Sequence, residues 1–543
     1  MKSRLKILGM SCLIAAAAVN ATSIQPAFSQ TTSLSSYQLA VKAAIDLSGA
    51  LAEDELSEAQ LSGIERFYAS SAYTPIWTDN LGVNFRGRQL EAILSRSYRH
   101  GFPTGNYSLA ALQLRLDSRD PAELARLELD MSRAFVAYAH DLAAGRIDPE
   151  TVNRSIYLDP RAPTATRVLL NAATKSSIVA YARELEPDTP RYRRMMVALD
   201  QYRHQSANGG WIQVPRGKVI KPGDDDPRVS ALRIRLTASG DMPPGHHIGT
   251  VYDSFVEAGV KKFQARHGLA EDGILGPNTM KEINVPVIDR IAQMELNLER
   301  RRWLKDNLGD RFVFVNLADQ HLTLIENGKP AWTSPVVIGK PYHATPVFTE
   351  KMEYLVMNPN WNIPKSIATK EMLPKLRRNP GALARQNISV RTGWSSNSKT
   401  IDPYSVNWRY VSSSDFPFRL QQGPGSNNAL GRVKFMFPNR HNIYIHDTPA
   451  KNLFSRTSRT FSHGCVRVQN PLELARHLLD EQGWSRSEID SQIASGKRRV
   501  VSLKRPWPVY VTYLTAWVDA DNVVQFRRDV YGRDKKLKAA LRQ

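Results

Sequence analysis

The chain has 543 residues and a formal net charge of +21, from 73 Lys and Arg against 52 Asp and Glu. Hydrophobic residues make up 42% of the sequence, an ordinary fraction that excludes a mostly disordered chain. The length allows three or four domains of about 150 residues each, and two cysteines are too few for a disulfide scaffold.

Residues 1–29 have the composition of a secretory signal. A basic start precedes the apolar stretch of residues 7–19, and Ala27-Phe28-Ser29 places small residues at the cleavage site. We therefore expect an exported, periplasmic protein that begins near Gln30 and has no later membrane-spanning segment. The signal contains three cations and no acids, so the mature chain keeps a charge near +18.

At this charge the protein should attract polyanions. Because the chain is predicted to leave the cytoplasm, nucleic acid is not an expected partner. The carboxylates of cell-wall peptides and anionic lipid headgroups are the partners that the charge suggests. The charge is equally compatible with a role in solubility alone.

Residues 37–205 are predicted to form a helical scaffold domain. Asp120-Pro121 should open its longest helix and Gly145 should end it. Residues 286–308 predict one more helix, which is expected to rejoin this domain. The apolar side chains of the longest helix recur at helical spacing and should form one buried face: Leu127, Met131, Phe135, Tyr138 and Leu142.

Residues 224–285 follow a linker rich in Gly and Pro and are predicted to form a compact helical module. Phe263-Gln264-Ala265-Arg266-His267-Gly268-Leu269 precedes Asp272-Gly273-Ile274-Leu275-Gly276-Pro277-Asn278-Thr279. In this order the two motifs resemble the peptidoglycan-binding type 1 domain, a small three-helix module. Turn glycines and core phenylalanines explain the same motifs as parts of the fold. Binding to the cell wall is therefore what the resemblance implies.

Residues 309–533 are predicted to be mainly β-structure. Asn327-Gly328 between two apolar runs is typical of a tight hairpin, and the strands within 509–526 should end the sheet as a second hairpin. Residues 364–420 are rich in charge, Pro, Gly and Ser and should form an inserted lid. Residues 534–543 are predicted to be a basic tail. The predicted fold class is multidomain: a helical scaffold, a three-helix module and a mainly β domain with a lid.

The most informative chemical feature is Cys465 within Ser462-His463-Gly464-Cys465. Cys12 lies in the signal, so Cys465 is the lone cysteine of the predicted mature chain, whereas secreted proteins normally pair their cysteines. His446 follows a predicted strand, shares a face with Tyr444, and can act as a base for the thiol. The residues alone leave a buried structural thiol and a zinc ligand as alternatives.

The neighbours of Cys465 are compatible with a nucleophile. Gly464 permits close approach of an acyl oxygen, and the turn around it can aim backbone N–H groups at one point. Arg467 can bind a substrate carboxylate through two hydrogen bonds. Cations in residues 448–460 favour the thiolate and attract carboxylates.

His446 followed by Ser462-His463-Gly464-Cys465-Val466-Arg467-Val468 resembles the L,D-transpeptidase catalytic domain, and the likeness covers residues 311–533. Residues 357–364 and Gly431-Arg432-Val433-Lys434-Phe435 resemble the long periplasmic subclass. That subclass combines a helical scaffold domain, a peptidoglycan-binding domain and a lidded catalytic domain. One departure is Gln469, where the family usually has a small polar residue.

The resemblance implies a role for each matching residue. Cys465 would be the nucleophile and His446 its base. His463 and Gly464 would shape the site and supply oxyanion N–H groups together with Cys465, and Ser462 would support His463. Three further side chains would contact the substrate: Arg467, Tyr444 and Trp361.

The resemblance also implies a reaction on peptidoglycan stem peptides. A tetrapeptide donor loses D-alanine and forms a thioester with Cys465, and a diaminopimelate amine of a second stem resolves the thioester into a 3→3 cross-link. No metal or cofactor is expected, and carbapenems should acylate the same thiol. The sequence leaves open an L,D-carboxypeptidase, an enzyme that attaches an outer-membrane protein to the wall, and a non-catalytic peptidoglycan-binding protein.

Overall fold

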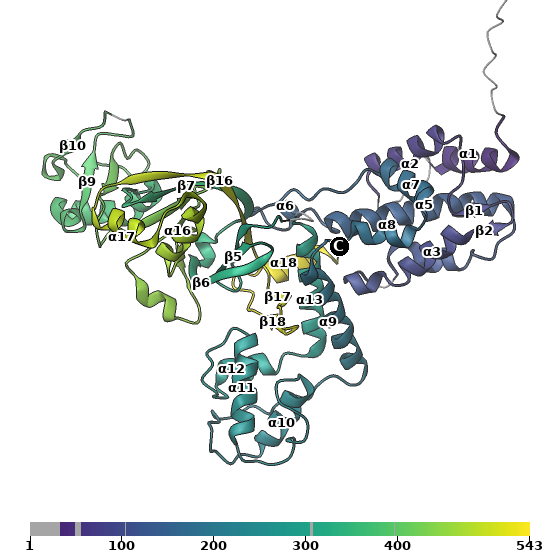
Figure 1. Ribbon diagram of the computed structural model, residues 1–543, viewed down its shortest axis with the longest axis horizontal. Coiled ribbons are helices and arrows are strands. Elements are labelled where there is room, and N and C mark those ends of the chain that lie inside the picture. The colour runs from purple at the N-terminus through teal and green to yellow at the C-terminus, as the bar shows by residue number, and fades with distance from the viewer. Residues whose placement is uncertain (1–32, 49–55, 104, 305–307, 396, 543) are drawn as a thin grey trace, which may run out of the picture.

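The computed structural model describes residues 33–48, 56–103, 105–304, 308–395 and 397–542. The predicted signal at residues 1–29, with Cys12, lies outside these ranges. Figure 1 shows a helical body at one end, a β-rich body at the other, and a small helical module that projects from the centre. This arrangement confirms the predicted fold class. No helix within the described ranges is both long enough and apolar enough to cross a membrane.

The helices of the helical body pack around α5 (Pro121–Ala144). Two short strands, β1 (Thr78–Asp79) and β2 (Gly82–Val83), form a hairpin beside it. The other elements of this body are α1 (Ser36–Ser48), α2 (Glu58–Ser70), α3 (Phe85–Leu94), η1 (Ser97–His100), η2 (Asn106–Ser108), α4 (Leu109–Gln113), α7 (Ala165–Thr174) and α8 (Ile178–Leu185).

The limits of α5 agree with the prediction. The side chain of Asp120 accepts a hydrogen bond from the N–H of Ala122, Pro121 occupies the first turn, and Gly145 ends the helix at a φ of 88°. The predicted apolar face is buried. In the middle of this helix the carboxylate of Glu128 accepts hydrogen bonds from three successive backbone N–H groups, those of residues 76–78. A buried charge is thereby satisfied, and it holds the segment before β1 against α5.

Helices α9 (Pro190–Ala207) and α13 (Val287–Arg302) lie side by side at the centre of the molecule, although the small module separates them in sequence (Figure 1). Their contact forms a core of its own, to which Met195, Leu199, Met294 and Leu298 contribute. The module is thus carried between two helices that touch each other.

The module consists of α10 (Arg228–Ala238), α11 (Ser254–Arg266) and α12 (Pro277–Ile283). Gln264 of its motif is buried, and its side-chain amide donates to Asp272 at 2.8 Å and to Thr279 at 3.1 Å. The Gln264 carbonyl oxygen accepts from the N–H of Gly273 at 2.9 Å. These contacts explain the motif as part of the fold.

Arg527 joins the module to the β-rich body. Its Nε donates to Asp319 at 2.5 Å and its Nη1 donates to the backbone carbonyl of Arg266 at 3.0 Å. Gly268 has a φ of 61°, and a Cβ there would lie 2.6 Å from Cδ of Arg527, so glycine is required for this approach. The module is therefore held by partly buried polar contacts as well as by chain connectivity.

The β-rich body contains one large sheet that closes on itself. Its strand order is β12-β13-β15-β6-β5-β4-β16-β7-β3, β14 pairs with β6, and β12 also pairs with β7. The bounds are β3 (Ile156–Tyr157), β4 (Phe312–Asn316), β5 (His321–Glu326), β6 (Lys329–Gly339), β7 (Val347–Met357), β12 (Val433–Met436), β13 (Ile445–His446), β14 (Thr460–Ser462), β15 (Val466–Val468) and β16 (Arg499–Thr512).

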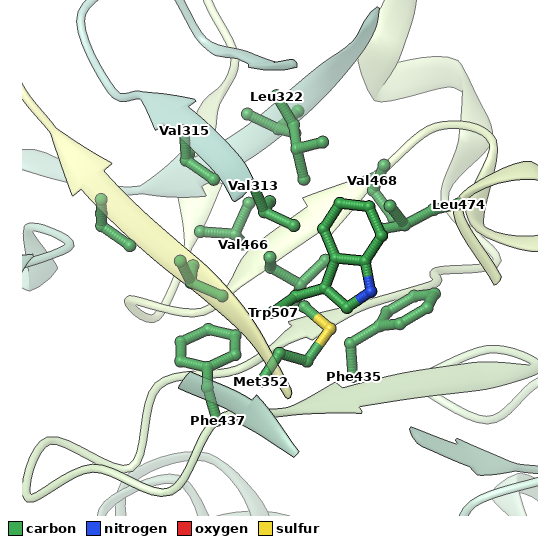
Figure 2. Close-up of a cluster of buried hydrophobic side chains, with 14 of the residues drawn as sticks. Val313, Val315, Leu322, Met352, Phe435, Phe437, Val466, Val468, Leu474 and Trp507 are labelled. Atoms are coloured by element: carbon green, nitrogen blue, oxygen red, sulfur yellow. The ribbon is translucent and has the colours of Figure 1, made fainter. Parts of the chain in front are cut away.

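Apolar side chains from these strands fill the space inside the sheet. Figure 2 shows Val313, Phe435, Val466 and Trp507 converging from different strands. Helices α16 (Pro471–Leu479) and α17 (Arg486–Ala494) contact each other, and α16 adds Leu474 to this core. The core fixes which face of each strand points inward, and so which residues are left for the opposite face.

The hairpin predicted at Asn327-Gly328 joins β5 to β6. Both turn residues have positive φ, 52° for Asn327 and 72° for Gly328, as a tight two-residue turn requires. Short helices outside the lid complete the β-rich body: η3 (Pro341–His343), η7 (Lys451–Ser455) and η8 (Asp480–Gln482).

The predicted lid region has its own small sheet and core. The strand order is β10-β9-β11-β8, and Leu376, Trp408 and Leu420 are buried against it. The elements are β8 (Trp361–Asn362), α14 (Lys365–Ile367), the π-helical turn η4 (Ala368–Met372), α15 (Leu373–Arg378), η5 (Pro380–Gln386), β9 (Ile388–Arg391), β10 (Thr400–Ile401), η6 (Pro403–Ser405) and β11 (Arg419–Gln422).

Two predictions for the C-terminal region were wrong. Strands β17 (Ala516–Val518) and β18 (Val524–Phe526) form a separate two-stranded sheet against α9 and α13 and do not extend the large one. Residues 533–540 form α18 (Arg533–Ala540), whose Leu537 is fully buried in the main core, so the predicted basic tail is largely an integral helix. A single buried leucine among lysines gives no periodic signal from which this helix could be recognised.

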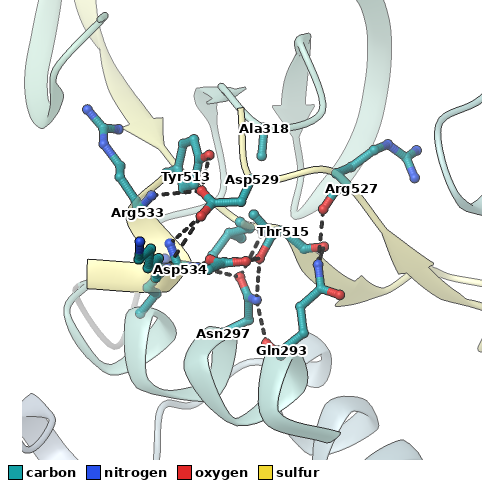
Figure 3. Close-up of polar contacts among 12 residues, drawn as sticks. Gln293, Asn297, Ala318, Tyr513, Thr515, Arg527, Asp529, Arg533 and Asp534 are labelled. Carbon is teal, nitrogen blue, oxygen red and sulfur yellow. Dashed lines mark hydrogen bonds and ion pairs between the residues drawn. The ribbon is translucent and has the colours of Figure 1, made fainter. Parts of the chain in front are cut away.

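A polar network ties α13, the start of β17 and α18 together (Figure 3). Asn297 exchanges two hydrogen bonds of 2.8 Å with Thr515, and the Thr515 hydroxyl donates to Asp534 at 2.9 Å. Arg300 donates to Asp534 at 2.5 Å, and its side chain is only 5% exposed. The network draws on three separate parts of the sequence, which are α13, Thr515 and α18, so it joins the helical centre to α18.

We predict that Asp534→Ala lowers the free energy of unfolding by about 3–5 kcal/mol, because it leaves the charge of Arg300 buried and unpaired. Chemical denaturation followed by tryptophan fluorescence measures the change. Asp521→Ala, at an exposed position, is the control and should have little effect. Equal stability of the two variants would contradict the structural importance of the ion pair.

Candidate active site

The parallel pairing of β13 with β15 sets the geometry of the site. The register pairs Ile445 with Val466, so Tyr444 lies beside Cys465. Alternate residues of a strand return to the same face, and His446 therefore shares a face with Cys465 as its diagonal neighbour. The opposite face, with Ile445 and Val466, belongs to the main core.

His446 is held as a neutral ring with one free nitrogen. It is 5% exposed, and its Nδ1 lies 2.5 Å from the backbone carbonyl of Asp447. A carbonyl can only accept, so Nδ1 carries the hydrogen and Nε2 keeps its lone pair. Burial, together with the charge of Arg467, lowers the pKa of His446 to about 3. At neutral pH the ring is thus a proton acceptor.

Asp447 fixes the backbone from which His446 projects. Its carboxylate accepts hydrogen bonds from Nζ of Lys451 at 2.6 Å, the N–H of Arg432 at 2.9 Å and the N–H of Thr448 at 2.7 Å. Burial alone would raise the pKa of Asp447, but these hydrogen bonds outweigh it and lower that pKa. Gly431 has a φ of 59°, and a Cβ there would lie 2.4 Å from the Asp447 carboxyl carbon.

The turn that carries Cys465 is held from within by Ser462. The hydroxyl of Ser462 donates to the carbonyl of Cys465 at 2.6 Å and accepts from the N–H of Gly464 at 3.1 Å. Gly464 has a φ of 117°, which L-residues rarely adopt. Ser462 thus supports the Gly464–Cys465 turn and not His463. The Gly464 N–H is engaged there, so Gly464 contributes backbone shape and not a free oxyanion donor.

The thiol of Cys465 is partly exposed and lies 3.8 Å from the carbonyl of Asn442. Burial raises the pKa of the Cys465 thiol, although hydrogen bonding with Tyr444 and the charges of Lys434 and Arg467 act in the opposite direction. The resting site is therefore a neutral thiol beside a neutral imidazole, so the proton has still to be transferred when the thiol attacks.

The lid contacts this site at two points. Nε2 of His463 lies 2.8 Å from the carboxylate of Glu371 on the lid, and both side chains are exposed. Trp361, on β8, is hydrogen bonded to Tyr444. The sequence-predicted residues Cys465, His446, Tyr444 and Trp361 are thus close together, whereas His463 is directed to the lid.

Three residues near this site were not recognised as site residues from the sequence. Lys434 lies directly opposite His446 across β12 and β13, Asp447 holds the His446 backbone, and Glu371 reaches the site from the lid. In the sequence, Lys434 belongs only to the stretch Gly431-Arg432-Val433-Lys434-Phe435, which resembles the long periplasmic subclass. Its place depends on strand pairing, which no local sequence pattern reports.

The arrangement can perform acyl transfer by a nucleophilic thiol. It provides a proton acceptor on the same face as the thiol, a fixed tautomer, a strained turn at the nucleophile and cations close by. A zinc site of the kind considered above needs a cluster of ligands. Within the described ranges no group of three or more His, Cys, Asp or Glu side chains is placed to hold a metal ion.

Comparison with known families agrees with this geometry. Residues 310–501 match the family model described as "L,D-transpeptidase catalytic domain". They form an L,D-transpeptidase catalytic domain. Residues 62–199 match a model described as "Scaffold domain", and residues 225–283 match one described as "Putative peptidoglycan binding domain". The L,D-transpeptidase domain thus accompanies the two domain types that the sequence resemblance had indicated.

A Haemophilus influenzae protein with the curated name "Putative L,D-transpeptidase" is 33% identical to this chain over 262 residues. The match covers 48% of this chain and 51% of that protein, so the chain spans about half the length of its curated relative. Crystal structures of L,D-transpeptidases from Stackebrandtia nassauensis and Xylanimonas cellulosilytica match at 15% and 16% identity. Each match covers 55% of this chain. The match covers 95% of the Stackebrandtia chain with a TM-score of 0.21, and 98% of the Xylanimonas chain with a TM-score of 0.17.

We predict that the rate at which iodoacetamide alkylates Cys465 of the L,D-transpeptidase domain has its pH midpoint above that of glutathione. Only the thiolate is alkylated, and a raised pKa leaves less of it at neutral pH. The rate should still increase with pH where the rate of glutathione in the same tube has levelled off. Peptide mass spectrometry at Cys465 measures the rate. A profile that levels off at or below that of glutathione would contradict the raised pKa.

We also predict that Gly431→Ala slows carbapenem acylation of Cys465 roughly tenfold or more, because small displacements at a catalytic centre cost that much. The new methyl group would overlap the Asp447 carboxylate and move the backbone that orients His446. Stopped-flow acylation and thermal unfolding are measured together. Gly276→Ala, where a Cβ meets open space at a φ of −82°, is the control. A normal acylation rate in Gly431→Ala would show that Asp447 does not position His446.

Proposed function

We propose that this protein is a periplasmic peptidoglycan L,D-transpeptidase that forms 3→3 diaminopimelate cross-links through a thioester on Cys465. The donor would be a tetrapeptide stem and the acceptor the side-chain amine of a second stem. The family match of residues 310–501 supports the reaction class. The match of residues 225–283 supports cell-wall peptidoglycan as the surface on which the enzyme works.

One observation carries the proposal: the register places Cys465 and His446 on one face, with Nε2 of His446 left without a hydrogen. We infer that rotation about the Cα–Cβ bond of Cys465 brings its sulfur from the Asn442 carbonyl toward the imidazole. Such catalytic hydrogen bonds commonly tighten only when substrate is bound. A dead domain has no need of a neutral, oriented base beside its cysteine.

In the first half-reaction Nε2 of His446 takes the thiol proton while the sulfur attacks the carbonyl between diaminopimelate and D-alanine. The tetrahedral oxyanion is stabilised by backbone N–H groups at the turn, of which the N–H of Cys465 is the candidate donor. The C–N bond then breaks, His446 returns its proton to the amine of D-alanine, and a thioester remains.

In the second half-reaction the acceptor amine attacks the thioester carbonyl. Its proton passes to His446, the C–S bond breaks, and the sulfur recovers the proton. Water would compete at this step, so we infer that the lid, with Trp361 and Glu371 near the site, limits its access. Tyr444 and Arg467 would contact the substrate on the face that carries the thiol.

We predict that the purified chain converts disaccharide-tetrapeptide monomers into a dimer lighter than two monomers by one D-alanine. Cys465→Ala should form no dimer, because the bond to the enzyme cannot form, and His446→Gln should lose at least about a hundredfold in rate. Liquid chromatography with mass spectrometry identifies the products. A carbapenem should add to the wild-type chain and not to Cys465→Ala.

The alternative functions give different products in the same experiment. Release of D-alanine with only a tripeptide product would indicate an L,D-carboxypeptidase. A thioester resolved only by an added outer-membrane protein would indicate its attachment to the wall. Sedimentation with peptidoglycan but no product and no carbapenem adduct would indicate a binding protein. Dimer formation by Cys465→Ala would refute the proposed nucleophile.

A further inference from the structure

Two cations flank His446 on the face of the sheet that carries the thiol. Lys434 on β12 lies opposite His446, and Arg467 on β15 is its partner on the other side. Since paired residues share a face, the three side chains form a row across three strands. The row next to it contains Tyr444 and Cys465.

Neither cation has an anionic partner among the residues that the structure describes. Nε of Arg467 is buried and has no hydrogen bond, and no ion pair involves its guanidinium. The ammonium group of Lys434 lies over the ring of Tyr444, 4.2 Å from its centre. Burial lowers the pKa of both side chains, which reflects how poorly their charges are solvated.

Several buried cations of this chain have a carboxylate partner, whereas Arg235 and Arg533 are fully buried and donate to neutral oxygens. Arg266, Arg290, Arg300 and Arg302 each contact a carboxylate at 2.5–2.7 Å. Charge that is partly removed from water and unpaired is costly, and here two partly buried cations flank His446 on one face. The resting thiol is neutral and does not compensate them. The arrangement therefore points to an anion that arrives with a ligand.

We propose that Lys434 and Arg467 form a subsite for the C-terminal carboxylate of the donor peptide. This inference rests on the proposed function for the identity of the donor and adds a residue, Lys434, that neither the sequence nor the family match assigned. In a tetrapeptide donor the carboxylate of D-alanine is separated from the scissile carbon by only the amide nitrogen and one Cα. Arg467 is two residues from Cys465, about 6.6 Å along the strand, within the reach of such a group.

The subsite gives the enzyme a means of recognising the end of its donor. A free carboxylate would neutralise both cations and accept hydrogen bonds from Arg467. A donor whose fourth residue continues into another amide would place a neutral group there and leave both charges unpaired. Donors with a free end at residue four would then be selected by electrostatics as well as by shape.

The first test uses two small alkylating reagents of similar shape, iodoacetate with a carboxylate and iodoacetamide without one. The alkylation rate of Cys465 with iodoacetate is divided by its rate with iodoacetamide, and the result is divided by the same ratio for glutathione. This normalised ratio measures attraction of a carboxylate at the thiol. We expect this normalised ratio to exceed one in the wild-type chain and to fall roughly tenfold in Lys434→Met, as loss of one close charge predicts. Lys434→Arg should largely retain it.

Lys329→Met removes a cation from an exposed position of β6 and is the matched control, for which the ratio should stay at the wild-type value. If Lys434→Met does not fold, Arg467→Met is measured in its place. A wild-type ratio of one or less, or an unchanged ratio in the variant, would overturn the proposal. So would an equal slowing of both reagents, because the cations would then act only on the thiolate.

The second test uses the donor itself. Wild-type enzyme should release D-alanine from a tetrapeptide muropeptide at least about tenfold faster, in kcat/KM, than D-alaninamide from its C-terminal amide. Lys434→Met should reduce this preference to near unity. A preference that persists in the variant would overturn the subsite. Failure of the wild type on both donors would count against the proposed function, while the alkylation ratio would still decide whether the cations attract a carboxylate.

Discussion

The parallel pairing of β13 with β15 is the constraint on which the candidate site depends. It places Cys465 diagonal to His446 and brings Arg467 to the same face. A slip of one residue would exchange these side chains with their apolar neighbours, because successive residues of a strand face opposite ways. The register is secured from behind, where Ile445 and Val466 are fully buried. The chemistry on one face is thus positioned by hydrophobic packing on the other.

Polar contacts that are buried or partly buried fix the positions of the domains, as hydrophobic packing fixes the positions of the strands. Arg527 holds the module against the β-rich body, and the network of Asn297, Arg300 and Asp534 holds α13 against the end of the chain. In each case the charge is paired, and its geometry is fixed by several hydrogen bonds. At the site, Lys434 and Arg467 have no carboxylate partner among the described residues and lie beside the thiol, which is why they suggest a ligand.

Local patterns were sufficient for the elements that local chemistry determines. The hairpin at Asn327-Gly328 and the limits of α5 follow from turn and cap residues, and the motif around Cys465 pointed to the candidate nucleophile. What failed depends on distant contacts. Helix α18 is stabilised by burial of one leucine and by pairing with α13, and the position of Lys434 follows from a ladder between strands. Neither is encoded in the neighbouring residues, so neither could be predicted from the sequence.

The contact between His463 and Glu371 has a consequence for how the lid behaves. Both side chains are exposed, and ion pairs of that kind contribute at most about 1 kcal/mol. Such a latch changes the ratio of closed to open forms by only about fivefold. If the protein acts on stem peptides as proposed, this ion pair opposes displacement of the lid by the substrate only weakly.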